Sequence, residues 1–168
     1  MAMASKIMTL IHEHNLEPAS TLIKDDLTHS QTDERYINFT QARLLLADVA
    51  IAKRRENAAI RILEETVLMA KNNGTRLLTD VYAKLANLYR NRGSLGQASV
   101  AYVSAIASAD QNRDMYLAPD LILTLARLKR ELHQDEEAEV LFRRATEVVE
   151  GMLAHTADVR IQVFSLKG

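Results

Sequence analysis

The sequence contains no cysteine and no tryptophan, and only 5 glycines and 2 prolines among its 168 residues. Without cysteine the chain can form no disulfide framework and no thiolate site. Scarce glycine and proline leave few sharp turns, so long regular elements are favoured. Alanine, leucine, glutamate and arginine recur instead and are good helix formers, while runs of alternating β-branched residues are missing. The composition therefore predicts an all-α fold.

The chain also lacks an excess of charge of one sign, because it has 21 basic and 22 acidic residues and a formal net charge of -1. A general nucleic-acid binder needs a basic excess or a basic stripe, so no nucleic-acid partner is expected. The sequence has no run of about 18 apolar residues and no signal peptide at its start. We therefore expect a cytoplasmic protein that does not enter the membrane.

Motifs that carry chemistry are absent as well. The one histidine cluster is His12-Glu13-His14, and residues two apart do not share a helix face. The sequence lacks zinc-ligand spacing, a calcium loop and a nucleophile motif of the G-x-S-x-G type. We expect no metal, no cofactor and no catalytic residue, so the chain is predicted not to be an enzyme.

Short runs of charged residues or glycines fit helix ends and turns. Asp25-Asp26 and Asp135-Glu136-Glu137 are interpreted as first turns of helices, where the helix dipole favours carboxylates. The stretch from Gly93 to Gly96 lacks the lysine of a phosphate loop, so its glycines indicate a hairpin turn. Lys53-Arg54-Arg55 is interpreted as a solvated turn, in preference to a nucleic-acid or lipid patch.

The feature that is present is an internal repeat. A shift of 40 residues superimposes small residues on small ones and large residues on large ones in three copies, with no gap. Self-similarity at a fixed period of this length indicates tandem supersecondary units. The aligned sets include Ala58, Ala98 and Ala138; Leu45, Leu85 and Leu125; and Ile62, Tyr102 and Phe142.

The clearest copy resembles the tetratricopeptide repeat family through Leu85, Ala86, Tyr89, Gly93, Ala98, Tyr102 and Ala105. The third copy has Lys129 at the aromatic position, and the first has Leu46 at a small one. The period is longer than the usual one of about 34 residues and is similar to that of kinesin light chains and bacterial signalling proteins. The resemblance implies an α-solenoid of antiparallel helix hairpins, each stabilised by stacking on its neighbours.

The pattern predicts one domain over residues 1–168. It consists of a degenerate hairpin at 3–28, repeats at about 37–73, 76–110 and 116–153, and a helix at 155–167. That last helix is either a polar-sided cap or the opening helix of a further repeat, and its apolar residues slightly favour the second reading.

The resemblance also implies a peptide-binding groove, since in this family the first helix of each hairpin lines the concave surface. Asparagine can bind a peptide backbone through donor and acceptor together, and arginine can clamp a carboxylate. Asn87 matches an asparagine of the carboxylate-binding members, whereas their lysines have no match here. The alternative is that these side chains only solvate the face. The candidate residues are Arg43, Asn87, Arg90, Asn91, Arg127 and Arg130, with Ala47, Ala83 and Leu123 at flanking groove positions.

The hypothesis that follows is a protein-interaction module whose groove binds an acidic or extended peptide. Two alternatives stay open. The chain could be a regulatory segment of a larger bacterial signalling protein, or a scaffold that self-associates through its solenoid ends.

Overall fold

The structure, a computed structural model of the chain, describes residues 6–7, 9–10, 12–13, 15–29, 36–70, 77–113 and 117–165, with the backbone alone at 25–29, 36–39 and 156–165. Most of the loop predicted at residues 29–34 and the helix stop predicted at 72–74 lie outside these ranges. Residues 6–7, 9–10 and 12 are helical. The longer helices are α2 (Leu16–His29), α3 (Tyr36–Ala52), α4 (Glu56–Ala70), α5 (Leu78–Asn91), α6 (Leu95–Asn112), α7 (Ala118–Glu131) and α8 (Asp135–Ser165).

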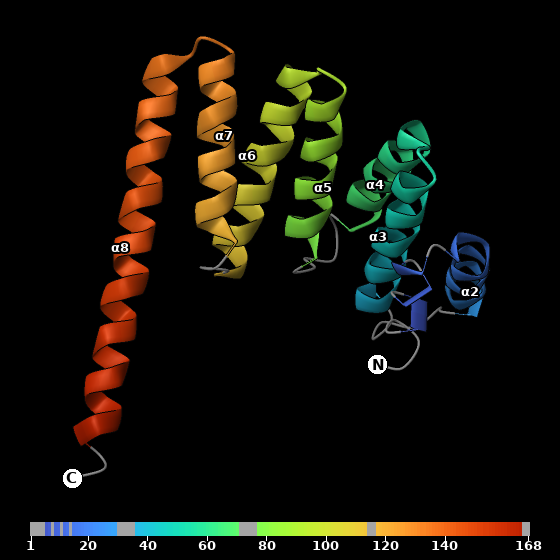
Figure 1. The fold of residues 1–168 in the computed structure, drawn as a ribbon, viewed down its shortest axis with the longest axis horizontal. Coiled ribbons are helices and arrows are strands. Elements are labelled where there is room, and N and C mark those ends of the chain that lie inside the picture. The colour runs from blue at the N-terminus through green and yellow to red at the C-terminus, as the bar shows by residue number, and fades with distance from the viewer. Residues whose placement is uncertain are drawn as a thin grey trace.

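The helices stand side by side in one row that runs from α2 to α8 (Figure 1). The pairs α3–α4, α5–α6 and α7–α8 form hairpins, and successive hairpins pack through α4 on α5 and α6 on α7. Helix α2 packs on α3 at the other end of the row. This arrangement confirms the predicted all-α solenoid of stacked hairpins.

The three hairpins turn in the same way. Arg54, Gly93 and His133 each follow a first helix with a positive φ of 56°, 74° and 58°. The next residue donates its backbone N–H to a carbonyl five residues earlier, at 2.8 to 2.9 Å in all three turns. A residue in the left-handed conformation, followed by a hydrogen bond that spans five residues, is a common way for a helix to end. It satisfies carbonyl groups of the last helical turn. The repeat in the sequence is therefore a repeat in backbone geometry.

The turns also correct the register of the repeat. Gly93 and His133 are 40 residues apart, but Arg54 and Gly93 are 39 apart. The gapless shift of 40 therefore fails for the first hairpin, which is one residue out of step. Burial shows the same slip, because the alanine equivalent to Ala98 is the fully buried Ala59 and not the half-buried Ala58.

Small residues occupy fully buried positions that repeat from one hairpin to the next. Ala47, Ala86 and Ala126 are fully buried at equivalent positions of α3, α5 and α7 once the slip is allowed for. Tyr102 on α6 is the largest fully buried side chain in the described part of the chain, and the buried Leu63 occupies the equivalent position in the first hairpin. Fully buried small residues and fully buried large ones thus both recur along the solenoid, as a close-packed interior requires.

Among the residues that the structure describes, the buried core forms two clusters. The main one runs through the three hairpins and includes Leu63, Tyr102 and Leu128. A smaller one joins Ile7, Ile23 and other residues of the N-terminal helices to one side of α3. Helix α3 contributes to both, so it is apolar on two faces and links the N-terminal segment to the rest.

Helix α8 is longer than expected, since it runs without a break over 31 residues. The predicted boundary between the third repeat and a separate terminal helix, near residues 153–155, lies inside α8. No proline lies in this stretch, and Gly151 is accommodated within the helix. The C-terminal half of α8 extends well beyond α7 (Figure 1). Its role as a cap or as the opening of a further repeat stays a prediction.

None of the described helices is both long and apolar enough to cross a membrane. Within the same residues, no three histidine, aspartate or glutamate side chains gather as a metal site would require.

Candidate peptide-binding face

The first helix of each hairpin, namely α3, α5 and α7, contributes side chains to one surface of the solenoid, which we call the first-helix face. Two ion pairs join neighbouring first helices across it. Lys84 Nζ of α5 lies 2.6 Å from Asp48 Oδ1 of α3, and Arg90 Nη2 of α5 lies 2.6 Å from Glu131 Oε1 of α7. The side chains of both pairs are between a quarter and a half exposed. These contacts place successive first helices beside one another at the surface.

Asp48, Asn87 and Arg127 form a row along this face, one residue from each first helix. They are equivalent positions when the first hairpin is shifted by one residue. Asn87 and Arg127 are exposed, and Asp48 is partly exposed and engaged by Lys84. The row carries an acid, an amide and a base in turn, so its chemistry changes from one hairpin to the next.

The orientation of the Asn87 amide is set by a hydrogen bond from the buried side of the first-helix face. The Tyr102 hydroxyl, on the buried side chain that α6 contributes, donates to Asn87 Oδ1 at 2.5 Å. Burial raises the pKa of Tyr102 above its usual value, and the nearby Arg90 guanidinium partly opposes the rise. The hydroxyl therefore stays protonated and remains a donor near neutral pH. With its oxygen occupied, the amide has two N–H donors left for a ligand.

The other predicted residues differ in whether their side chains already form hydrogen bonds, ion pairs or ring contacts within the protein. Arg127 and Asn91 are exposed and form no hydrogen bond or ion pair with any residue that the structure describes. Arg90 is engaged by Glu131, as above. The Arg130 guanidinium lies over the Phe142 ring of α8, 5.0 Å from its centre, a distance typical of a cation–π contact. Arg127 and Asn91 are thus unengaged among the described residues, and Asn87 keeps its two N–H donors on the first helix next to that of Arg127.

Arg43 lies elsewhere. Its Nε donates to Thr66 Oγ1 at 2.8 Å, and one terminal nitrogen contacts Glu65 Oε2 at 2.6 Å. Both partners belong to α4, and the Arg43 side chain is only 12% exposed. The one-residue slip explains the difference, because Arg43 is equivalent to the fully buried Ile122 and not to Leu123. Ala47 is likewise fully buried.

Sequence reasoning missed Asp48, Lys84 and Glu131 on this face, and also the Tyr102 hydroxyl beneath it. A shift of 39 instead of 40 would have found Asp48. The other residues carry no such signal, because they depend on which helices become neighbours.

The second helices α4, α6 and α8 carry a different surface. Large apolar side chains are exposed there, among them Leu68, Val100 and Val140 at 70%, 68% and 61%. A hollow of about 340 Å³ lies beside Val100, between α5 and α6, with Tyr82, Leu85 and Tyr89 in its lining. Such side chains mark a protein contact, a membrane contact or a ligand-binding groove where they join into one contiguous patch.

No family model matches the chain, and no curated protein is significantly similar to it in sequence. Solved structures do match. The chain is similar to BtubC (BKLC) from P. vanneervenii, with a TM-score of 0.74 and 17% identity over 88% of this chain. It spans 62% of the length of BtubC. The hairpins and the match together define the class, an all-helical repeat solenoid.

Two further structures specify the repeat. A putative kinesin light chain from Podosopora anserina with TPR-like repeats matches 94% of this chain and 74% of its own, with a TM-score of 0.62 and 15% identity. SycD, a type III secretion translocator chaperone of Yersinia enterocolitica, matches 79% of this chain and 84% of its own, with a TM-score of 0.61 and 14% identity. The fold is that of the tetratricopeptide repeat.

Proposed function

We propose that the chain is a protein-interaction module that binds a peptide segment of a partner along its first-helix face. The observation that carries the proposal is the pair formed by Asn87 and Arg127. The Asn87 amide is fixed by Tyr102 with its donors unoccupied, and Arg127 is exposed on the next first helix without a partner among the described residues. Fixed donors bind a ligand at a smaller entropic cost than mobile ones.

The chemistry of the two side chains indicates the kind of ligand. An amide N–H can donate to a backbone carbonyl, and a guanidinium can hold a carboxylate through two parallel bonds. An extended peptide with an acidic side chain offers both groups. The acidic Asp48 at the other end of the row, already engaged by Lys84, would limit such a segment to the α5–α7 part of the face.

The proposal is supported, at a coarser level, by the kind of protein that shares the fold. SycD is a chaperone of secretion translocators, and the exposed apolar side chains of the second helices also fit a protein that works through contacts with other proteins. The role proposed is binding, with no catalytic step.

The proposal is tested with a peptide selected from a random library by the wild-type chain. The Asn87→Ala/Arg127→Ala variant should bind that peptide at least about tenfold more weakly, since two hydrogen-bonded contacts are lost. Circular dichroism should show unchanged helicity. Affinity is measured by isothermal titration calorimetry.

Two further variants separate binding from folding. Arg127→Ala alone removes an exposed side chain with no described partner, so it should weaken binding without any change in thermal stability. Arg143→Ala on α8 is the matched control, because Arg143 is also exposed and unpaired among the described residues. If the double variant binds as tightly as the control, the first-helix face is not the binding site.

A further inference from the structure

A basic cavity lies away from the first-helix face, on the edge of the solenoid where the three hairpins turn. Its volume is about 670 Å³. The lining comes from the α3–α4 turn, the first turns of α4 and the end of α5, and we call it the basic edge cavity. The residues that line it are Arg54, Arg55, Glu56, Asn57, Ala58, Arg61 and Arg92.

The positive charge of this cavity is not neutralised within the described part of the chain. All four arginines are exposed, and none forms an ion pair with a described residue. Arg55 contributes to the lowered pKa of Glu17, an acid outside the cavity, but the main cause of that lowering is Lys53. Arg92 partly opposes the rise in the pKa of Tyr89. Glu56 is the single acid in the lining. Four guanidinium groups and one carboxylate leave a local excess of positive charge.

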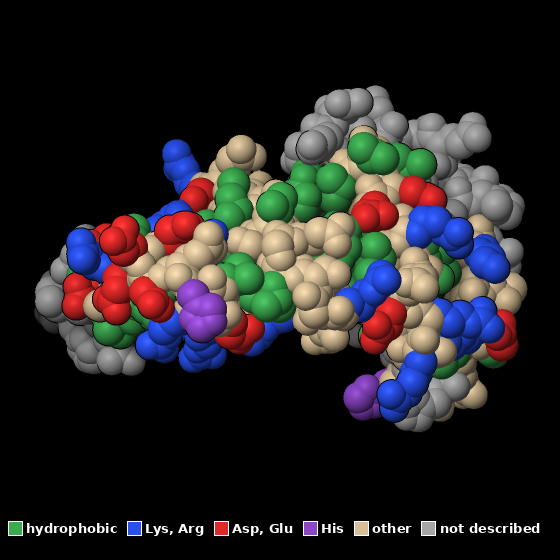
Figure 2. All heavy atoms as spheres, turned by 90° about the horizontal axis from the view of Figure 1, so that it is seen from above, with side chains coloured by type: hydrophobic (Ala, Val, Ile, Leu, Met, Phe, Trp, Pro, Cys, Tyr) green, Lys and Arg blue, Asp and Glu red, His purple; other side chains and the backbone are tan. Residues whose placement is uncertain are grey.

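The equivalent turn between α7 and α8 is different. There Asp135, Glu136 and Glu137 begin α8, and Lys129 Nζ lies 2.7 Å from Glu137 Oε2. That turn neutralises the basic end of its first helix with the acidic start of its second. Looking down on the turns, basic side chains gather over α3 and α4, and acidic ones are most numerous near the start of α8 (Figure 2). The unpaired basic residues of the basic edge cavity are therefore not a general property of the hairpin turns in this fold.

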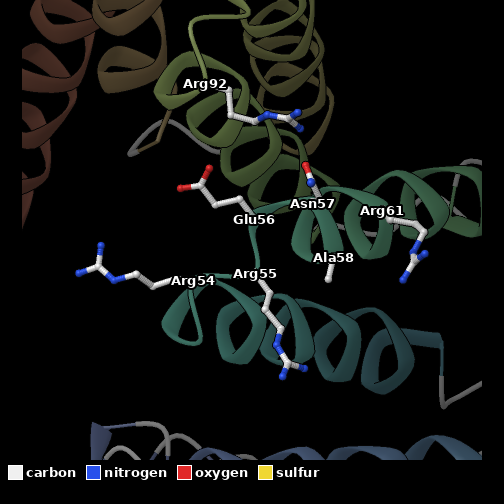
Figure 3. Close-up of a pocket in the computed structure, with 7 residues that line it drawn as sticks. All are labelled: Arg54, Arg55, Glu56, Asn57, Ala58, Arg61 and Arg92. Carbon is white, nitrogen blue, oxygen red and sulfur yellow. The ribbon is translucent and has the colours of Figure 1, made fainter.

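The arrangement of the arginines indicates the size of the ligand. Arg54, Arg55 and Arg61 point in three different directions, and Arg92 reaches over the start of α4 from the other side (Figure 3). Guanidinium groups that diverge in this way cannot all contact one small anion. They can contact several anionic groups spaced along a chain, and the open cavity is large enough for several side chains.

We propose that the basic edge cavity binds an acidic segment of a partner polypeptide, one that carries several aspartates or glutamates. Carboxylates suit the site because arginine binds them with two parallel hydrogen bonds. This second surface is independent of the first-helix face, so either proposal can fail without the other. Because the arginines are exposed, the binding weakens as salt screens the charges.

The test uses the full chain and an oligo-glutamate peptide labelled with an uncharged dye, with fluorescence anisotropy at low ionic strength. The Arg54→Gln/Arg61→Gln variant should bind the peptide about tenfold more weakly than the wild type, from two lost ion pairs. An oligo-serine peptide should not bind.

The chain offers a close control in Arg113→Gln/Arg143→Gln. It removes the same charge from exposed sites, and Arg113 has a positive φ of 55° that matches the 56° of Arg54. The control should bind oligo-glutamate within about twofold of the wild type.

Three outcomes would overturn the proposal. Equal losses in the cavity variant and the control would mean that the peptide responds to net charge alone. Tighter binding of oligothymidylate than of oligo-glutamate would assign the cavity to a nucleic acid. Self-association of the wild type in sedimentation at low salt, lost in the cavity variant, would make a second copy of the chain the occupant.

Discussion

Tyr89 is a side chain whose surroundings make the stability of the fold depend on pH. It lies on α5 near the junction with α4, and its hydroxyl donates to Glu64 Oε1 of α4 at 2.5 Å. Burial, and then the Glu64 carboxylate, raise the pKa of Tyr89 to about 12 from an ordinary value of 10. Ionised Tyr89 would place two negative charges in contact, so the hydrogen bond between hairpins exists only while the phenol keeps its proton.

The sign of the pH effect follows from the raised pKa. Below the ordinary pKa both the folded and unfolded states keep the proton, and the contact contributes fully to stability. As the pH rises from about 10 towards about 12, the unfolded state ionises first, so the free energy of unfolding falls.

We expect Tyr89→Phe to flatten this fall by about 1 kcal/mol, an estimate reduced for solvent screening because the contact is near the surface. Urea denaturation at a series of pH values from about 8 to about 11 measures the effect. Glu64→Gln, which removes the charge but keeps an acceptor, should flatten the curve as well. Parallel curves for all three proteins would show that the contact does not control alkaline stability.

The sequence marked Tyr89 as one of the residues that carry the resemblance to the tetratricopeptide repeat, but it did not predict which side chain Tyr89 would contact. Glu64 becomes its partner only when α4 packs on α5, and no local pattern specifies that contact.

At the scale of the helix, close packing depends on the small residues. Ala86 of α5 is fully buried, and the sequence repeat alone predicted a small residue there. Where the prediction failed, in the first hairpin, the local sequence gave two equal choices. Ala58 and Ala59 are both alanines, and Leu44, Leu45 and Leu46 are all leucines, so residue identity allows either register and only burial separates them.

We expect Ala86→Leu to destabilise the chain by about 1–3 kcal/mol or more, because three added carbon atoms would have to enter a filled helix interface. Ala107→Leu on α6 is the control, since Ala107 is exposed and leucine is nearly as good a helix former as alanine. Thermal unfolding followed by circular dichroism compares the two. Similar melting temperatures would contradict the close packing described for Ala86.

At the scale of the molecule, the two core clusters divide the solenoid into parts that need not unfold together. The N-terminal cluster contains Ile23 of α2, and the main cluster contains Ile122 of α7. Both side chains are fully buried. The sequence anticipated a weaker N-terminal hairpin, but it gave no sign that α3 would serve both clusters. That role appears only when α2 packs on one side of α3 and α4 on another.

We expect Ile23→Ala, a truncation that typically costs about 2–5 kcal/mol, to speed amide hydrogen exchange in α2 while α5 to α7 keep their protection. Ile122→Ala should instead lower protection in α5 to α7. Hydrogen exchange measured by mass spectrometry resolves the helices. A uniform loss of protection in both variants would show that the chain unfolds as one unit.

The neighbour-by-neighbour packing also has a mechanical consequence. Most contacts join helices that are adjacent in the row. In the described part of the chain, no sheet links helices that are far apart in the row. A force applied to the two ends would peel hairpins away one after another, each step breaking only one interface. Such a chain extends in small steps under tension, and it shortens again as its hairpins restack.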